Sequence, residues 1–128
     1  MPDLRSLACA ALLLLPAPAA LAHARVIRSI PAKGAELSQP PEQIELWFNE
    51  LLDAGFNSLE VFISSEIGQP KHTNLAKGKP VVAARDRTHL SLKLEPLAPG
   101  EYAVEWRVLS RDGHSAPGRF TFRILPAK

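Results

Sequence analysis

Short runs of alternating apolar and polar residues constrain the fold of this chain most, because side chains two apart in a strand lie on one face of a sheet. Turn residues separate the runs, and the 12 prolines of the chain suit turns and strand ends but interrupt helices. Beyond residue 22, no apolar pattern of helical period is long enough for a substantial helix. The pattern predicts seven strands, at residues 24–30, 44–48, 59–63, 80–84, 90–94, 102–108 and 120–124.

Seven strands joined by proline- and glycine-rich connections within about a hundred residues predict an all-β chain that folds as one antiparallel β-sandwich. Strand parity places Trp106 in the core and Trp47 on an outer face or in packing between the sheets. The same argument places His89 on an exposed face. We expect the polar stretch 64–78, which is rich in Gly, Lys and Pro, to be the least ordered part.

Residues 1–22 have the features of a secretory signal peptide, which is removed from the exported protein. Arg5 gives a positive start, residues 7–15 form a short apolar run, and residues 20–22 are a small-x-small cleavage site. The run is too short to span a bilayer, and no later stretch approaches the ~20 apolar residues that a membrane helix needs. We therefore expect an exported protein without a membrane anchor, whose mature chain begins at His23.

Removal of this leader also removes the only cysteine and the only methionine, Cys9 and Met1. The mature domain then has no disulfide and no sulfur ligand for a soft ion such as Cu(I), so its donors are nitrogen and oxygen. The formal net charge of +2 is spread along the chain. Because no basic run contains interleaved aromatic residues, nucleic acid is not an expected partner.

The triplet Asp112-Gly113-His114 follows the last but one predicted strand and could bind a metal ion. In extended backbone, residues two apart project to the same side, so Asp112 and His114 can face one ion of the Cu(II) or Zn(II) kind. Asp-Gly is also a common hairpin turn, and the triplet alone fits a plain turn better than a site.

An N-terminal His23 changes this balance, because its α-amine and imidazole form a chelate. With a ring nitrogen of His114, the amine and Nδ1 of His23 give three nitrogens in a T-shaped plane, a histidine brace. Asp112 adds an oxygen. Tetragonal nitrogen and oxygen ligation favours Cu(II), which also heads the Irving–Williams order among divalent ions.

Several further motifs extend over essentially the whole mature chain. They are His23-Ala24, residues 29–35 (SIPAKGA), 44–50 (IELWFNE), 97–102 (LAPGEY), 102–114 (YAVEWRVLSRDGH), Gly118 and 120–122 (FTF). In these motifs the chain resembles the CopC copper-resistance proteins of the bacterial periplasm. The most specific element is the join of Trp-Arg-Val to Ser-x-Asp-Gly-His, paired with a histidine that cleavage exposes.

The resemblance implies an immunoglobulin-like Greek-key β-sandwich or barrel, with residues 23–128 as one copper-binding domain. It also implies one Cu(II) ion per mature chain, held by His23, Asp112 and His114. Glu50 corresponds to a glutamate that is a ligand or a hydrogen-bond partner of the terminal amine, and we favour the second role.

As a function, the resemblance implies a periplasmic protein of copper sequestration, trafficking and resistance that is not an enzyme. The implied partner is an inner-membrane copper transporter of the CopD kind, and we expect a monomer. Some relatives carry a methionine-rich loop for Cu(I), but the corresponding residues 64–74 contain no methionine here. The chain thus matches the subgroup with the Cu(II) site alone, and we interpret His72 in this loop as solvated rather than as a remnant ligand.

Two other functions stay open on the sequence. A copper-dependent oxidative enzyme of the polysaccharide monooxygenase type shares the histidine brace. Against it, a ligand at Asp112 would occupy space that oxygen activation needs. The chain is also short and has few exposed aromatic residues with which to form a flat glycan-binding surface. The second is a metal-free immunoglobulin-like adhesion or chaperone module, in which residues 112–114 are only a turn.

Overall fold

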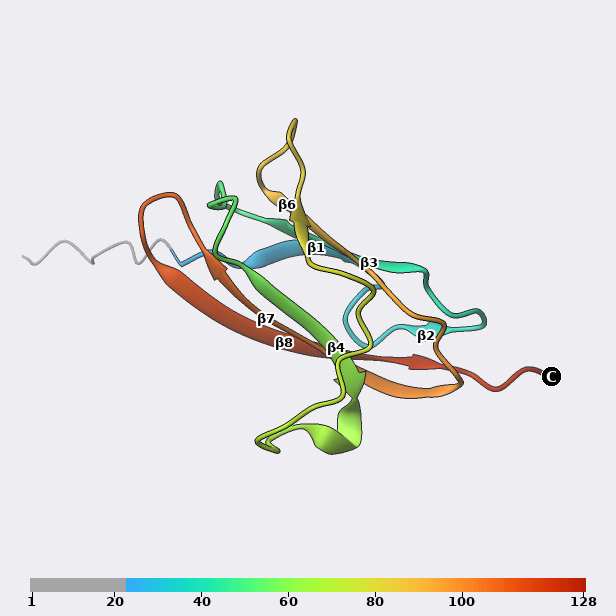
Figure 1. Cartoon of the computed structure of the whole chain (residues 1–128). Coiled ribbons are helices and arrows are strands. Elements are labelled where there is room, and N and C mark those ends of the chain that lie inside the picture. Colours follow the sequence, from blue (N-terminus) through green and yellow to red (C-terminus); the bar gives the residue numbers. More distant parts are fainter. Residues whose placement is uncertain (1–22) are drawn as a thin grey trace, which may run out of the picture.

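The computed structural model describes residues 23–128, which form two four-stranded sheets packed face to face (Figure 1). The first sheet has the order β1-β3-β6-β5, with β1 at Val26–Ile30, β3 at Gln43–Phe48, β6 at His89–Lys93 and β5 at Val81–Val82. The second has the order β2-β8-β7-β4, with β2 at Glu36–Leu37, β8 at Ser115–Ile124, β7 at Gly100–Leu109 and β4 at Ser58–Ile63. A single 3-10 turn, η1 at Ser64–Glu66, follows β4 in this part of the chain.

The predicted all-β, immunoglobulin-like sandwich is confirmed. The predicted signal peptide, residues 1–22, lies outside the described residues. Every strand pair is antiparallel except β2 with β8, which is parallel. Within residues 23–128, no helix has the length and hydropathy needed to cross a membrane.

The core follows from the alternation in the sequence. In β3, Ile44, Leu46 and Phe48 are buried between the sheets, while Glu45 and Trp47 on the other face are partly exposed. Trp106 of β7 lies in the same core, so both tryptophans have the predicted positions.

Two strand predictions needed correction. The described residues form eight strands rather than the predicted seven. The additional strand, β2, is not predicted because it is only two residues long and depends on its pairing with β8. Strand β8 begins at Ser115, five residues before the predicted start. The first half of this strand is not predicted because it contains Pro117 and Gly118, residue types that are rare inside strands. Pro117 is exposed, and Gly118 lies opposite Trp106 in the β7–β8 register.

Gly118 leaves room for the Trp106 indole ring. A Cβ placed on this glycine would lie 2.2 Å from Cζ2 of Trp106, a separation that real Cβ atoms essentially never show. The ring also packs edge-on to Phe48, with centroids 6.3 Å apart, and against Phe120 at 5.8 Å. The glycine is therefore part of the core packing.

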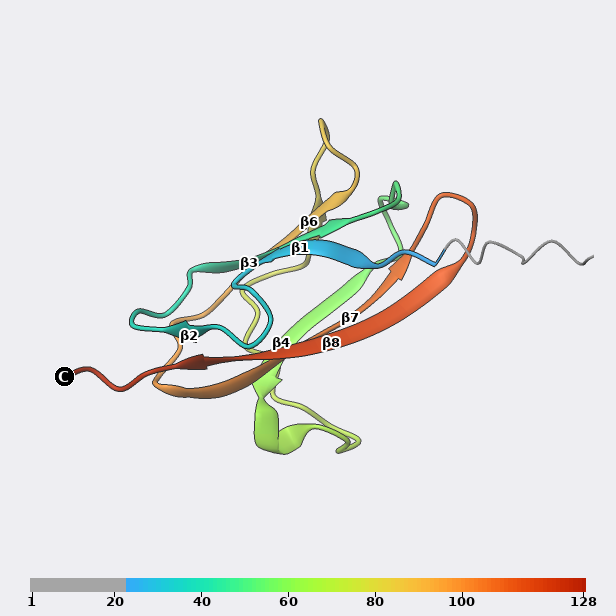
Figure 2. The same ribbon diagram turned by 180° about the vertical axis from the view of Figure 1, so that it is seen from behind.

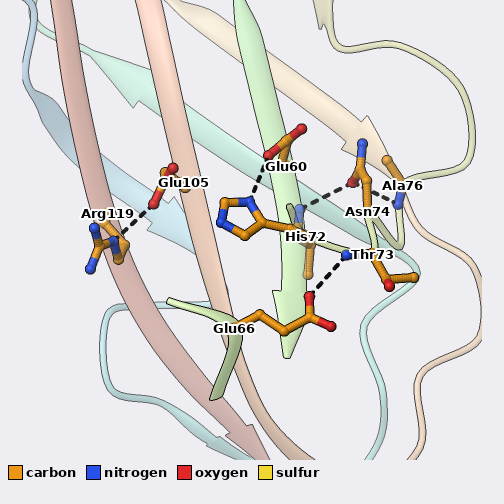
Figure 3. A network of polar contacts seen from close by, with 9 residues as sticks. Glu60, Glu66, His72, Thr73, Asn74, Ala76, Glu105 and Arg119 are labelled. Carbon is orange, nitrogen blue, oxygen red and sulfur yellow. Dashed lines mark hydrogen bonds and ion pairs between the residues drawn. The ribbon is translucent and has the colours of Figure 1, made fainter. Parts of the chain in front are cut away.

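The loop after β4 covers part of the outer face of the second sheet (Figure 3). Phe62 is fully buried outside the main core, and the His72 ring stacks on it with centroids 3.9 Å apart. His72 Nδ1 lies 3.4 Å from Oε2 of Glu60, and the backbone N–H of Thr73 donates to Glu66 at 2.9 Å. The His72 side chain is only 16% exposed, so its interpretation as a solvated residue is wrong. Its ring covers an aromatic side chain that water would otherwise reach.

A second group of packed side chains lies on the outer face of the first sheet. The rings of Trp47 and His89 are stacked, 4.3 Å apart and nearly parallel, and the Arg28 guanidinium lies 4.4 Å from the Trp47 ring. His89 Nε2 lies 3.2 Å from a Glu45 carboxylate oxygen. His89 is thus on the predicted face but largely covered by its neighbours.

Candidate metal centre

The β7–β8 hairpin carries Asp112 and His114 at one end of the sandwich, the end at which the described chain begins (Figures 1 and 2). The last residue pair of the hairpin joins Leu109 to Ser115. In the turn that follows, the N–H of Gly113 donates to the carbonyl of Ser110 at 2.9 Å. Gly113 has φ +92°, a left-handed conformation that glycine adopts readily. The triplet is therefore a hairpin turn, and this turn also presents its two candidate ligands together.

Ser110, which is buried, holds the turn through its side-chain hydroxyl. Its hydroxyl lies within hydrogen-bond distance of Asp112 Oδ1 and, at 3.1 Å, of the His114 carbonyl. Asp112 Oδ1 also accepts the backbone N–H of His114 at 3.1 Å. The Ser110 hydroxyl first, and then the His114 N–H, hold the pKa of Asp112 below its usual value because both stabilise the charged carboxylate. At neutral pH Asp112 is an ionised, oriented oxygen donor.

The second carboxylate oxygen of Asp112 faces the His114 ring, with Oδ2 and Nδ1 3.3 Å apart. Both side chains are largely exposed, so an ion can reach them from solvent. Two donors, each about 2.0 Å from a first-row divalent ion, lie about 2.8–3.3 Å apart when their bonds subtend 90–110°. The spacing of these two atoms suits neighbouring ligands of one ion.

The N-terminal segment brings His23 to the same place. Ala24 is buried, and Arg25 exchanges two hydrogen bonds with Asn49, which follows β3. His23 itself is exposed, and its ring centroid lies 6.3 Å from that of His114, with an angle of 68° between the ring planes. Two histidines that are 91 positions apart in the sequence thus lie side by side.

The connection between β3 and β4 supports the hairpin from the other side. Leu52 is fully buried and forms an isolated bridge with Ser110. The N–H of Arg111 donates to the Leu51 carbonyl at 3.0 Å, and that of Asp53 to the Leu109 carbonyl at 2.8 Å. These bonds fix the turn to the body of the sandwich, so the two candidate ligands lie on a well-supported backbone.

Glu50 is not joined to these residues in the same way. It follows Asn49 and is half-buried, and it makes no hydrogen bond or ion pair with another of the residues 23–128. Within the same range, no three His, Cys, Asp or Glu side chains lie close enough to hold a metal ion together. The predicted donor set includes the α-amine of His23, a main-chain group, which in the uncleaved chain is a peptide nitrogen.

Three residues that build this end of the molecule have no site role that the sequence patterns indicate: Ala24, Asn49 and Ser110. Serine and aspartate both favour turns, because their side chains bond to nearby backbone groups, but this preference does not single out Ser110. The role of Asn49 depends on a contact with a segment 24 residues away, which no local pattern contains.

Comparison with known proteins identifies the family. A family model described as the CopC domain matches residues 26–125. Protein YobA of Escherichia coli (strain K12) is 34% identical over 111 residues, which cover 84% of this chain and 82% of that protein. Copper resistance protein C of Pseudomonas syringae pv. tomato is 33% identical over 106 residues, with 82% of each chain covered.

The fold comparison agrees with the sequences. The crystal structure of CopC from Methylosinus trichosporium OB3b superposes with a TM-score of 0.69 at 26% identity, covering 83% of this chain and 97% of that one. The family model spans nearly all of the described residues, from the start of β1 to the residue after β8. The chain belongs to the CopC family.

Proposed function

We propose that the mature protein binds one Cu(II) ion at this end of the sandwich and sequesters or carries it in copper homeostasis and resistance. The observation that carries the proposal is that His23 and His114, from two distant segments, lie side by side, and that Asp112 lies beside the His114 ring. The name of the Pseudomonas relative, a copper resistance protein, supports copper as the cargo. Donors limited to nitrogen and oxygen support the Cu(II) state.

The spacing of the two imidazoles also supports a shared ion. An imidazole nitrogen about 2.0 Å from a metal places the ring centre about 3.1 Å from it, so two imidazoles on opposite sides of one ion have centres about 6.2 Å apart. The rings of His23 and His114 are 6.3 Å apart. In this arrangement the α-amine of His23 and Asp112 take the remaining positions of the plane, and Glu50 accepts a hydrogen bond from the amine.

The site is completed by export. Cleavage after residue 22 by a signal peptidase releases the α-amine of His23, and the periplasm is the compartment in which the mature chain acts. There the protein, a monomer, delivers its ion to an inner-membrane transporter of the CopD kind. The role is that of a carrier rather than an enzyme, because a carboxylate ligand at Asp112 fills a position that oxygen activation would need.

Replacement of a ligand on the hairpin tests the proposal. In the mature chain, His114→Ala should weaken Cu(II) binding at least about 100-fold. A metal ligand contributes no less than the residues that hydrogen-bond to ligands, whose loss costs about 10–100-fold. His72→Ala is the matched control: it removes a histidine of the same chemistry at the far end of β4, and affinity should be unchanged. Competition titration against a Cu(II) chelator of known affinity measures both. Equal affinities of wild type and His114→Ala would leave a metal-free binding module as the better account.

A further inference from the structure

Asn49 is not among the proposed copper ligands, yet it holds the segment in front of β1 through two hydrogen bonds. Asn49 Oδ1 accepts the backbone N–H of Arg25 at 2.8 Å, and the backbone N–H of Asn49 donates to the Arg25 carbonyl at 3.1 Å. The two bonds copy one residue pair of an antiparallel ladder, with a side-chain oxygen in place of a carbonyl. They extend the pairing of β1 with β3 beyond the last paired residues, Val26 and Phe48.

Ala24 completes this hold. The residue is only 6% exposed and belongs to the core cluster, although only one residue of the mature chain precedes it. The first residues of a domain are usually poorly ordered unless they are tied down. Here the burial of Ala24 and the two bonds to Arg25 leave only the rotations of His23 itself to be fixed when an ion binds.

We infer that Asn49 is a positioning residue of the Cu(II) site: its side-chain oxygen holds the N-terminal arm so that His23 stands opposite His114 before copper arrives. The inference rests on the proposed function, which it deepens by naming what orders the terminal ligand. Asn49 does not touch the ion. It acts by reducing the freedom that His23 loses on binding, which is the usual source of affinity in a preorganised site.

The variant Asn49→Ala tests the inference in the mature chain that begins at His23. Loss of one hydrogen bond that orders a ligand should weaken Cu(II) binding about tenfold. The apo protein should keep its thermal midpoint, because Asn49 is exposed and the buried Ala24 still anchors β1. The Cu(II) EPR spectrum should broaden or show a second species, which a purely structural residue elsewhere would not cause.

Two further variants make the test specific. Asn74→Ala removes another exposed asparagine whose Oδ1 accepts backbone N–H groups, those of Val61 and Ala76, far along the chain from the arm (Figure 3). It should leave Cu(II) affinity unchanged. Asn49→Asp keeps the acceptor oxygen and should retain wild-type affinity within about threefold when 0.5 M salt screens the added charge.

The outcomes separate this inference from the proposed function. Wild-type affinity and an unchanged EPR spectrum in Asn49→Ala, with His114→Ala still impaired, would overturn the positioning role and leave the copper site standing. Equal losses in Asn49→Ala and Asn49→Asp would also overturn it, because the acceptor oxygen would then not matter. Binding of the wild type that does not depend on His114 would instead remove the proposed function.

Discussion

The mature chain that begins at His23 should bind Cu(II) about 10³-fold more tightly than the uncleaved chain. In the precursor the nitrogen of His23 is a peptide amide, so the ion loses one arm of a chelate. Joining two ligands through one residue gives the second an effective concentration that raises affinity 10²–10⁴-fold. Competition titration of the two purified forms measures the ratio, and intact mass confirms where each chain starts.

A shorter extension gives a sharper comparison. A chain that keeps five leader residues in front of His23 should bind as weakly as the full precursor. Extensions of one or two residues are avoided, because a new terminal amine and the intervening peptide nitrogens could form a chelate of their own with the His23 ring. If the five-residue extension bound as tightly as the mature chain, the terminal amine would not be a ligand.

Gly118→Ala should lower the free energy of unfolding by about 3 kcal/mol or more, the upper range for overpacking a core. The added Cβ would lie 2.2–2.7 Å from three atoms of the Trp106 ring, so the indole must leave its place between Phe48 and Phe120. Urea unfolding of the mature apo protein, followed by far-UV circular dichroism, measures the change.

Gly55→Ala is the matched control for this substitution. Its Cβ would meet only a carboxylate oxygen of Asp53, at an ordinary contact distance of 3.7 Å, and neither glycine has a positive φ. Its free energy of unfolding should change by no more than about 0.5 kcal/mol. In a Trp106→Leu background, Gly118→Ala should cost much less than in the wild type, because the clashing ring is gone. Similar losses in both glycine variants would show that the indole contact is not the cause.

The sequence predicts the strands whose side chains alternate cleanly, and those predictions hold. β3 is the clearest case, since its buried and exposed residues follow one another without exception. Prediction fails where the tertiary structure decides: β2 exists only through its pairing with β8, and the first half of β8 contains Pro117 and Gly118. The proline is exposed, and the glycine fits the large Trp106 side chain of the neighbouring strand.

The candidate site divides in the same way. Asp112 and His114 are close in sequence, and both lie in the turn that Asp-Gly predicts. In the structure Oδ2 of Asp112 is 3.3 Å from Nδ1 of His114. No local pattern predicts the approach of His23 to His114, which the structure shows. Its prediction depends on the hypothesis that cleavage makes His23 the first residue. The interpretation of His72 as solvated is wrong because its neighbours, Phe62 and Glu60, are set by the fold of the loop and not by the polar composition of the loop.

The most direct test of this account is the EPR spectrum of the mature protein loaded with one equivalent of ⁶³Cu(II), together with its electron spin-echo modulation. We expect a single axial species with nitrogen splitting from three nitrogens, two of them imidazoles, and the loss of one imidazole signal in His23→Ala and in His114→Ala. A spectrum that is the same in the wild type and in both variants would contradict binding by His23 and His114.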